Sequence, residues 1–427
     1  MSFPRYPKYK PSGVEWLGDV PEGWEVKPLR SVFKFSKGLT ITKENLQDEG
    51  VNCVNYGEIH SKYGFRLNPA IHPLRCVSPE YLSTNPEALI RDGDFTFADT
   101  SEDLEGSGNF THLRSDDPIF AGYHTIIARP RKDTCSLLLA YQIHSSVFRS
   151  QIQSQVKGVK VFSISQGILK GAKCWLPPLA EQTAIAEFLD RETGKIDGLV
   201  AEQRRLMELL KEKRQAVISH AVTKGLNPHA PMKPSGIEWL GDVPAGWVTC
   251  ALKRVVRMQS GESITAESIA ETGNYPVYGG NGLRGFTSEF THNGTYVLIG
   301  RQGALCGNIN YANEKFWASE HAVVATPTKP VDTFWLGEMV RAMNLNQYSI
   351  AAAQPGLSVD LVGRLGIPLP PLAEQIAIAA YLTKELAKFD TLTTAAQRAI
   401  DLLQERRTAL ISAAVTGQID VRPQTQN

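Results

Sequence analysis

Two stretches of the chain place apolar residues at helical spacing over several heptads. The first follows the proline pair at 177–178 and ends before Gly225, and the second follows the proline pair at 370–371 and ends before Gly417. Proline disfavours helix in the residue before it and glycine is a common stop, so these positions delimit two helices. Each helix is predicted to span roughly 40 residues, or on the order of 60 Å.

A mostly apolar seam is predicted along each helix, as a coiled coil requires. In the first helix it comprises Ile185, Glu192, Leu199, Leu206 and Lys213 in one row and Leu189, Ile196, Gln203, Leu210 and Val217 in the other. The pattern returns 193 residues later, with Ile378, Glu385, Leu392, Ala399 and Arg406 beside Leu382, Phe389, Ala396, Leu403 and Leu410.

Charged residues in this predicted seam indicate how the helices are oriented. A parallel pair would bring Glu192 to Glu385 and Lys213 to Arg406, and like charges repel. An antiparallel pair matches Glu192 with Arg406 and Lys213 with Glu385 instead. We therefore expect antiparallel helices with two charge-paired layers. The alternative is that these four long side chains extend along the helix edge into solvent.

Outside the helices the pattern changes to short β-type runs. Residues 25–175 and 248–368 contain runs such as YHTIIARP and TYVLIG, separated by Gly, Asn, Asp and Pro turns. Each stretch predicts a mixed α/β domain. The predicted fold class is α+β, with two mixed α/β domains separated by two long antiparallel coiled-coil helices in a pseudo-two-fold internal repeat.

Two motifs frame these domains, and each occurs twice. PSGVEWLGDVPEGW at 11–24 returns as PSGIEWLGDVPAGW at 234–247, and LPPLAEQTAIAEFL at 176–189 returns as LPPLAEQIAIAAYL at 369–382. The offsets are 223 and 193 residues, so the inserts differ in length by 30 residues. The predicted parts are 1–175, the first domain with its leading motif; 176–226, the first helix; 227–368, the second domain with its motif; and 369–427, the second helix and C-terminal tail.

Composition narrows the class of protein. The chain has 427 residues, 42% of them hydrophobic, and no apolar run near the roughly 20 residues that cross a bilayer. MSFPRYPKYK lacks the apolar stretch of a signal peptide, so a cytoplasmic location is expected. A net charge of +1 argues against a strongly basic, non-specific nucleic-acid binder but allows a specific one. The six cysteines are scattered and indicate neither a zinc site nor a disulfide framework.

Motifs that would indicate catalysis are missing from the sequence. It contains no GxxxxGK[ST], HExxH, GxSxG or NPPY motif. Gly280, Gly282 and Gly285 form a GxGxxG, but the dinucleotide fingerprint needs a helix at the glycines, and FTSEFTHNGTYV predicts turn and strand. A glycine-rich recognition loop or a plain structural turn are the two interpretations. We expect no catalytic residue, metal or cofactor in this chain.

The repeated EWLGDVPxGW and LPPLAEQxAIA motifs, each beside a variable domain, resemble the specificity (S) subunit of type I restriction-modification enzymes. The resemblance covers essentially the whole chain and implies two target recognition domains, each reading one half of a bipartite, asymmetric double-stranded DNA site. It also implies that the helices set the spacing and dock two modification subunits, which bind S-adenosylmethionine and methylate adenine. Restriction subunits would join them and use ATP and magnesium to translocate and cleave DNA.

The resemblance has a topological consequence. The first EWLGDVP motif has no helix before it, whereas the second follows one. The circular arrangement of the family, with the N-terminal segment near the end of the C-terminal helix, would make the two copies equivalent. Trp16, Trp24, Trp239 and Trp247 are then expected to be packing anchors at the junctions of helices and domains.

Base reading favours Arg for guanine and Asn or Gln for adenine. In the second insert the candidates are Arg284, Arg301, Gln302 and Asn308, and in the first they are Asn109, His112, Tyr123 and His124. Contact with phosphate rather than with bases is an open alternative for each. Two other functions are weighed: a coiled-coil adaptor whose two domains bind proteins or other ligands, and a stand-alone DNA-modifying enzyme, which the missing motifs disfavour.

Overall fold

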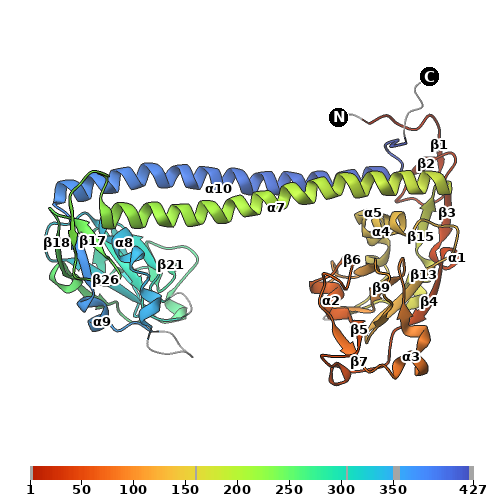
Figure 1. Cartoon of the computed structure of the whole chain (residues 1–427), viewed down its shortest axis with the longest axis horizontal. Helices are drawn as coiled ribbons and strands as arrows, with labels where there is room; N and C mark the ends of the chain where they lie inside the picture. The colour runs from red at the N-terminus through yellow and green to blue at the C-terminus, as the bar shows by residue number, and fades with distance from the viewer. Residues whose placement is uncertain (1–2, 159–160, 304–305, 350–355, 423–427) are drawn as a thin grey trace. The chain divides into compact units, whose positions relative to one another are not determined.

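The computed structural model describes residues 3–158, 161–303, 306–349 and 356–422. The chain forms two compact units, Met1–Ala201 with Ala399–Asn427, and Glu202–Arg398. Both boundaries fall inside the two long helices, so each unit holds one mixed α/β domain and part of each helix (Figure 1). The predicted fold class is confirmed. The last residues of the predicted C-terminal tail, 423–427, lie outside the described residues.

The domain of the first unit contains two sheets. The larger has the order β4 (Phe33–Lys37), β13 (Thr125–Pro130), β9 (Phe95–Ala98), β11 (Phe110–Leu113) and β6 (Phe65–Leu67). The smaller has the order β7 (Arg75–Val77), β5 (Val51–Val54), β12 (Ile119–Ala121) and β8 (Leu89–Ile90). Every residue of β9 and β11 is buried, because one apolar cluster covers each face of the larger sheet.

Short helices and strands complete this domain. They are α1 (Leu29–Val32), η1 (Lys43–Asn45), α2 (Tyr56–Ser61), α3 (Tyr81–Thr84), η2 (Pro86–Ala88), β10 (Thr100–Ser101), α4 (Ser136–His144), α5 (Ser146–Gln153), β14 (Phe162–Ser163) and α6 (Gln166–Gly171).

The domain of the second unit repeats this topology. Its sheets are β19 (Val256–Ser260), β26 (Ala322–Pro327), β23 (Tyr296–Gly300) and β24 (Ile309–Ala312), and β21 (Gly282–Thr287), β20 (Tyr275–Gly279), β25 (Lys315–Ala318) and β22 (His292–Asn293). In both smaller sheets the central pair is parallel, β5 with β12 and β20 with β25, and the outer pairs are antiparallel. The helices are η3 (Leu252–Arg254), η4 (Ala266–Ser268), α8 (Thr333–Ala342), η5 (Leu345–Tyr348) and α9 (Val359–Arg364).

The length difference between the domains is concentrated in one region. The offset is 223 residues from the start of β4 to the start of β19, but 197 from the start of β13 to the start of β26. Within this region the first domain places α2 and β6 between β5 and β7, whereas Gly280 and Asn281 alone connect β20 to β21. The two domains therefore share a framework and differ where the strands of the smaller sheet end.

The long helices are α7 (Leu179–Lys224) and α10 (Leu372–Val415). They begin next to the proline pairs, and the first ends one residue before Gly225 and the second two residues before Gly417. The φ angles of these glycines, 77° and 72°, suit glycine. The predicted limits are confirmed. No helix within the described residues is long and apolar enough to cross a membrane.

One of the two predicted seam rows is correct at its first residues, Ile185 and Ile378, which are fully buried, and is wrong by one residue from there on. The row from Leu189 to Val217 is buried or partly buried, as predicted, but the other row consists of the residues that follow Glu192, Leu199, Leu206 and Lys213. These inner residues are Thr193, Val200, Met207 and Arg214, and in α10 they are Leu386, Thr393, Ile400 and Arg407. The residues of a heptad seam are separated alternately by three and four positions. The prediction placed the residue after Leu189 three positions on, at Glu192, but in the structure it lies four positions on, at Thr193. Leu199 and Leu206 are therefore exposed.

The antiparallel orientation is confirmed, but other residues form the charge pairs. Arg407 bonds to Asp197 at 2.9 Å in the first unit, and Arg214 bonds to Asp390 at 2.5 Å in the second. These pairs are equivalent under the 193-residue repeat. Glu192 bonds instead to Arg191 and Lys195 of its own helix, and Glu385 bonds to Lys388. The expected Glu192/Arg406 and Lys213/Glu385 layers are therefore replaced, because these residues lie beside the seam.

The two repeated motifs bond to each other where a helix begins. The indole nitrogen of Trp24 donates to Glu181 at 2.8 Å, and that of Trp247 donates to Glu374 at 2.9 Å. Trp24 and Trp247 are each 1% exposed, which confirms them as anchors. Trp16, half-exposed, packs edge-on against Trp175, and Trp239 packs partly buried against the core of the second unit.

The glutamine beside each glutamate links the long helix to its domain. Gln182 donates to the carbonyl of Pro177 and accepts from the backbone of Cys135, the residue before α4. In the second unit Gln375 makes the same bonds, to Pro370 and from Asp332 before α8. The LPPLAEQ motif thus fixes the start of a long helix against both the tryptophan motif and the domain.

Strand pairs beside these junctions are also repeated. β1 (Tyr9–Pro11) pairs with β2 (Asp19–Pro21) as β16 (Met232–Pro234) pairs with β17 (Asp242–Pro244). β3 (Glu25–Pro28) pairs with β15 (Lys173–Leu176) as β18 (Val248–Ala251) pairs with β27 (Gly366–Leu369). In the second unit the chain passes directly from α7 into this region.

In the first unit the same region is assembled from both ends of the chain. The hydroxyl of Tyr9 donates to the carbonyl of Gly417 at 2.8 Å, and the backbone of Asp420 donates to that of Pro4 at 2.8 Å. Trp175 donates to the carbonyl of Val415. The expected packing of the N-terminal segment near the end of the C-terminal helix is confirmed.

The junction bonds predict unequal effects of two equivalent substitutions. Glu374→Ala leaves the buried indole N–H of Trp247 without its acceptor and is expected to cost about 1–3 kcal/mol of stability. Glu181→Ala is expected to cost more, because Glu181 also accepts from the hydroxyl of Tyr6 at 2.7 Å. Urea unfolding followed by tryptophan fluorescence measures both. The control, Glu187→Ala at an exposed position of α7, should change stability by less than about 0.5 kcal/mol; an equal loss in all three variants would contradict the bond's role.

Candidate nucleic-acid interface

Polar side chains gather where the strands of the two sheets end in the first unit. We call the set Tyr56, Asp99, Asn109, Tyr123 and His124 the first polar edge. Tyr56 follows β5, Asp99 follows β9, Asn109 precedes β11, and the last two form the turn between β12 and β13. Loops at strand ends can vary without disturbing the sheet, so such an edge can carry recognition.

Hydrogen bonds hold one side of the first polar edge rigid. The amide nitrogen of Asn109 donates to Nδ1 of His60 at 2.8 Å, and the guanidinium of Arg149 donates to the amide oxygen of Asn109 at 2.8 Å. Nε2 of His60 lies 2.7 Å from the carbonyl of Thr100, which can only accept. Both ring nitrogens of His60 are therefore engaged in hydrogen bonds.

Aromatic rings form the other side. The ring of Tyr56 meets those of Tyr123 and His124 edge-on, with centroids 5.7 and 5.5 Å apart. The imidazole of His124 is exposed, and its Nδ1 lies 3.1 Å from a carboxylate oxygen of Asp99. His124 has a φ of 54°, in the left-handed region that few side chains adopt. A cavity of about 600 Å³ opens beside these residues, lined also by His60 and Thr100.

The second unit has a corresponding edge. We call the set Asn281, Arg301, Gln302, Asn308 and His321 the second polar edge. The amide nitrogen of Asn308 donates to the amide oxygen of Asn281 at 3.2 Å, and Nδ1 of His321 lies 3.1 Å from the amide oxygen of Gln302. Arg301 donates to the hydroxyl of Ser260 at 3.1 Å. Three of the four residues predicted in this insert thus lie together.

The glycines of the GxGxxG belong to a β-hairpin and not to a nucleotide site. Gly280 lies in the turn between β20 and β21, and Gly282 and Gly285 lie in β21, so no helix opens at them. A Cβ on Gly280 would lie 3.2 Å from the carbonyl oxygen of His321, and one on Gly282 would lie 2.9 Å from the amide oxygen of Asn310. Arg284, the fourth predicted residue, is exposed on β21.

Two members of each edge are structurally equivalent. The backbone N–H of Ala98 donates to the carbonyl of Asn109, as that of Gly300 donates to Asn308. The N–H of Asp99 donates to His124, as that of Arg301 donates to His321. Asparagine and histidine are therefore retained at matching positions, although the inserts around them differ.

His112 is wrong as a DNA-contacting candidate. It lies on β11, fully buried at 0% exposure, with its ring centroid 4.7 Å from that of Phe95. Both ring nitrogens lack a hydrogen-bond partner among the described residues. Burial lowers the pKa of His112 to about 3, so the side chain is neutral at neutral pH. The other seven candidates are at least partly exposed.

Sequence reasoning missed Tyr56, His60, Asn281 and His321. His321 could have been matched with His124, because AGYH at 121–124 and ASEH at 318–321 precede similar apolar runs. The match is hidden by the change of offset within the insert. Asn281 gave no separate signal, since it stands within a glycine-rich run that is typical of any turn.

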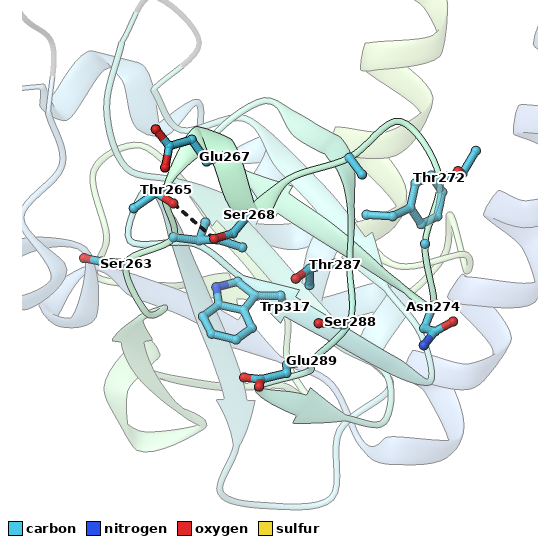
Figure 2. A pocket seen from close by; sticks show the side chains of 14 residues that line it. Ser263, Thr265, Glu267, Ser268, Thr272, Asn274, Thr287, Ser288, Glu289 and Trp317 are labelled. Atoms are coloured by element: carbon cyan, nitrogen blue, oxygen red, sulfur yellow. Dashed lines mark hydrogen bonds between the residues drawn. The ribbon is translucent and has the colours of Figure 1, made fainter.

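A further cavity of about 650 Å³ opens in the second unit (Figure 2). Figure 2 shows Trp317 among hydroxyl, amide and carboxylate side chains, with Thr265 and Ser268 bonded at 3.1 Å. In the first unit Phe120 occupies the position of Trp317 and is fully buried, with the ring of Tyr81 from α3 beside it. The cavity therefore exists because the shorter second domain lacks this covering helix.

Nothing in the described ranges suggests a metal centre. No group of three or more His, Cys, Asp or Glu side chains that could hold a metal ion occurs within those ranges. The six cysteines are free. Burial raises the pKa of the Cys53, Cys174, Cys250 and Cys306 thiols, which lowers their reactivity.

Comparison with known proteins defines the class. The model of the type I restriction modification DNA specificity domain matches residues 21–203 and 244–401. The chain belongs to this family. It is therefore a DNA sequence-specificity protein, a non-catalytic recognition component of a type I restriction-modification system.

Individual relatives agree with this assignment. The chain is 22% identical over 445 residues to the EcoKI specificity subunit of Escherichia coli K12, covering 96% of this chain and 92% of that subunit. It is 44% identical over 146 residues to the EcoprrI specificity subunit of Escherichia coli, covering 33% of this chain and 35% of that subunit. A solved chain of a type I restriction-modification system has the same fold, with a TM-score of 0.65 at 20% identity over 93% of this chain and 98% of that chain.

Because His112 is buried in its neutral form, we expect the folded chain to lose stability in mild acid. The unfolded chain binds a proton at this histidine near pH 6.5, whereas the folded chain binds one only near pH 3. The contribution of neutral His112 to the free energy of unfolding is therefore fully present above pH 6.5. It declines as pH falls toward 3, by up to about 1.4 kcal/mol per pH unit. His112→Leu should flatten this decline in unfolding experiments between pH 7 and 5.

The matched control is His220→Leu, at an exposed position of α7, which should leave the pH dependence unchanged. Some dependence will remain in His112→Leu, because burial also lowers the pKa of His144, to about 4. An unchanged slope in His112→Leu would show that His112 is not buried in its neutral form.

Proposed function

We propose that each domain is a target recognition domain that reads one half of a bipartite, asymmetric DNA site through its polar edge, and that α7 and α10 set the spacing between the half-sites. The single observation that carries this proposal is the contrast between a repeated framework and divergent strand ends. Homodimeric readers bind symmetric half-sites. A duplicated chain can change each half separately.

The composition of the edges supports base reading. Asparagine, glutamine and arginine present the donor and acceptor pairs that adenine and guanine edges require. Beside the shared asparagine and histidine, the first polar edge has Tyr56, Asp99 and Tyr123, and the second has Asn281, Arg301 and Gln302. Because these sets differ, the two half-sites should differ in sequence. The adaptor alternative has no support in the family match.

Exposed leucines on the long helices support a docking role with two equivalent partners. Leu199 and Leu392, related by the 193-residue repeat, are 52% and 51% exposed, and Leu209 and Leu402, also related by it, are 52% and 56% exposed. Leu199 and Leu402 belong to the first unit, and Leu209 and Leu392 to the second. Each unit thus presents one pair of leucines, as expected if two copies of one modification subunit dock.

The partners would supply the chemistry that the family requires. In this proposal the modification subunits bind S-adenosylmethionine and methylate adenine within each half-site. Restriction subunits, with ATP and magnesium, complete the complex. The chain itself contributes recognition and geometry and would work in the cytoplasm, where DNA is accessible.

Methylation mapping tests the recognition proposal. Cells that express this chain with its modification subunits should carry methylated adenine in a bipartite motif with two unlike halves, detected by single-molecule sequencing. Deletion of the chain should abolish the motif while the modification subunits are still expressed. A palindromic motif, or one that persists without the chain, would contradict the proposal.

Stoichiometry tests the docking proposal. The double variant Leu199→Glu/Leu402→Glu should retain one modification subunit instead of two, because a buried charge opposes apolar packing, and Leu209→Glu/Leu392→Glu should do the same. Native mass spectrometry of the co-expressed complex measures the loss. Ala201→Glu/Thr394→Glu adds the same charges at exposed, repeat-equivalent positions and serves as the control. Two modification subunits bound to both leucine variants would rule out this surface.

A further inference from the structure

Asn281 stands at the tip of the β20–β21 hairpin in the second polar edge. Gly279 and Gly282 pair across the turn, so Gly280 and Asn281 are its two central residues, and Asn281 is exposed. The turn is held by close packing, since a Cβ on Gly280 would lie 3.2 Å from the carbonyl oxygen of His321 and 3.4 Å from that of Gln302. The position of Asn281 is thereby fixed against the ends of the neighbouring strands.

A hydrogen bond fixes the orientation of its side chain as well. The amide nitrogen of Asn308 donates to the amide oxygen of Asn281 at 3.2 Å. In this bond the amide oxygen of Asn281 faces Asn308, and one lone pair on this oxygen stays free. Asn281 is exposed, and its only side-chain hydrogen bond within the described residues is the one at its oxygen, so both hydrogens of its amide nitrogen remain available. One acceptor and one donor side by side match the N6 and N7 groups of adenine.

The first unit shows which part of this arrangement is shared. Asn109 is the equivalent of Asn308, and its amide nitrogen also donates to a residue that follows the central strand of the smaller sheet. That residue is His60 in the first unit and Asn281 in the second. The donor is therefore the same in both domains, whereas the residue that accepts its hydrogen bond differs. Both ring nitrogens of His60 are engaged in hydrogen bonds, but the amide nitrogen of Asn281 is free to donate.

We propose that Asn281 reads an adenine in the half-site of the second domain, and that Asn308 is the positioning residue that orients the Asn281 amide. This inference rests on the proposed function, because it assigns a role within a DNA-reading domain. Asn109 makes the equivalent bond in the first domain, but both ring nitrogens of His60 are engaged there, so the reading role is assigned to the second domain alone.

The substitution that tests the reading role is Asn281→Ala. In cells that express the full chain with its modification subunits, the methylated motif should become degenerate at one adenine position of one half-site, with discrimination there reduced roughly 10- to 100-fold. The other half-site should be unchanged. Asn281→Asp, which keeps the shape but only accepts, should change the preferred base at this position. An Asn281→Ala motif identical to that of the unaltered chain would overturn the inference.

Asn308→Ala and Asn109→Ala form the matched pair that tests positioning. Asn308→Ala should relax the same position as Asn281→Ala, whereas Asn109→Ala should leave that adenine position unchanged. If Asn308→Ala lowers methylation at all sites equally and leaves the motif unchanged, Asn308 is merely structural and the positioning role fails. A control with the unaltered chain separates the two levels: no bipartite motif there refutes the proposed function, whereas a bipartite motif that Asn281→Ala preserves refutes only this inference.

Discussion

The architecture depends on a hydrogen bond that occurs twice, from a buried tryptophan indole to a glutamate at the start of a long helix. Trp24–Glu181 and Trp247–Glu374 each join the two sequence motifs that the chain repeats. A buried indole N–H without an acceptor is costly, so the bond fixes where the tryptophan motif sits on the helix. The adjacent glutamine then ties the same turn to the domain. Both units therefore join domain and helix in one geometry, whatever the insert contains.

This arrangement separates what must be constant from what can change. Strands that carry the sheets keep their order and orientation in both domains, whereas the connections at their ends differ in length. The first domain places a helix after its central strand, and the second makes a turn of two residues. Such changes leave the apolar cores intact, because they lie outside the strands. The same reasoning explains why Asn109 and Asn308 remain while their partners, His60 and Asn281, do not match.

The parts that sequence reasoning predicted correctly are those with strong local signals. Proline pairs and glycines delimit the long helices, and the repeated motifs locate the junctions where Trp24 and Trp247 bond to these helices. The prediction of the seam was wrong where two neighbouring rows of the helix are both apolar. Leu199 and Leu206 are as apolar as Val200 and Met207, and only packing against the partner helix decides which row is buried. His112 was a wrong candidate because the alternation of residues along a strand does not reveal whether one or both faces of the sheet are buried. Asn281 was missed because the observation that singles it out is a hydrogen bond from Asn308, 27 residues away in sequence.

The charge balance of the chain connects recognition with assembly. Tight DNA binding draws much of its free energy from cationic contacts with phosphate. This chain has 45 basic and 44 acidic residues, and its polar edges consist mainly of amides, imidazoles and phenols with one arginine in the second. Amides, phenols and neutral imidazoles can hydrogen-bond to bases and to phosphate, but they carry no positive charge. In the proposed complex, the subunits that dock on the helices would add cationic contacts with phosphate to the base contacts of this chain. Recognition and affinity would then be divided between subunits, and tight binding would depend on assembly.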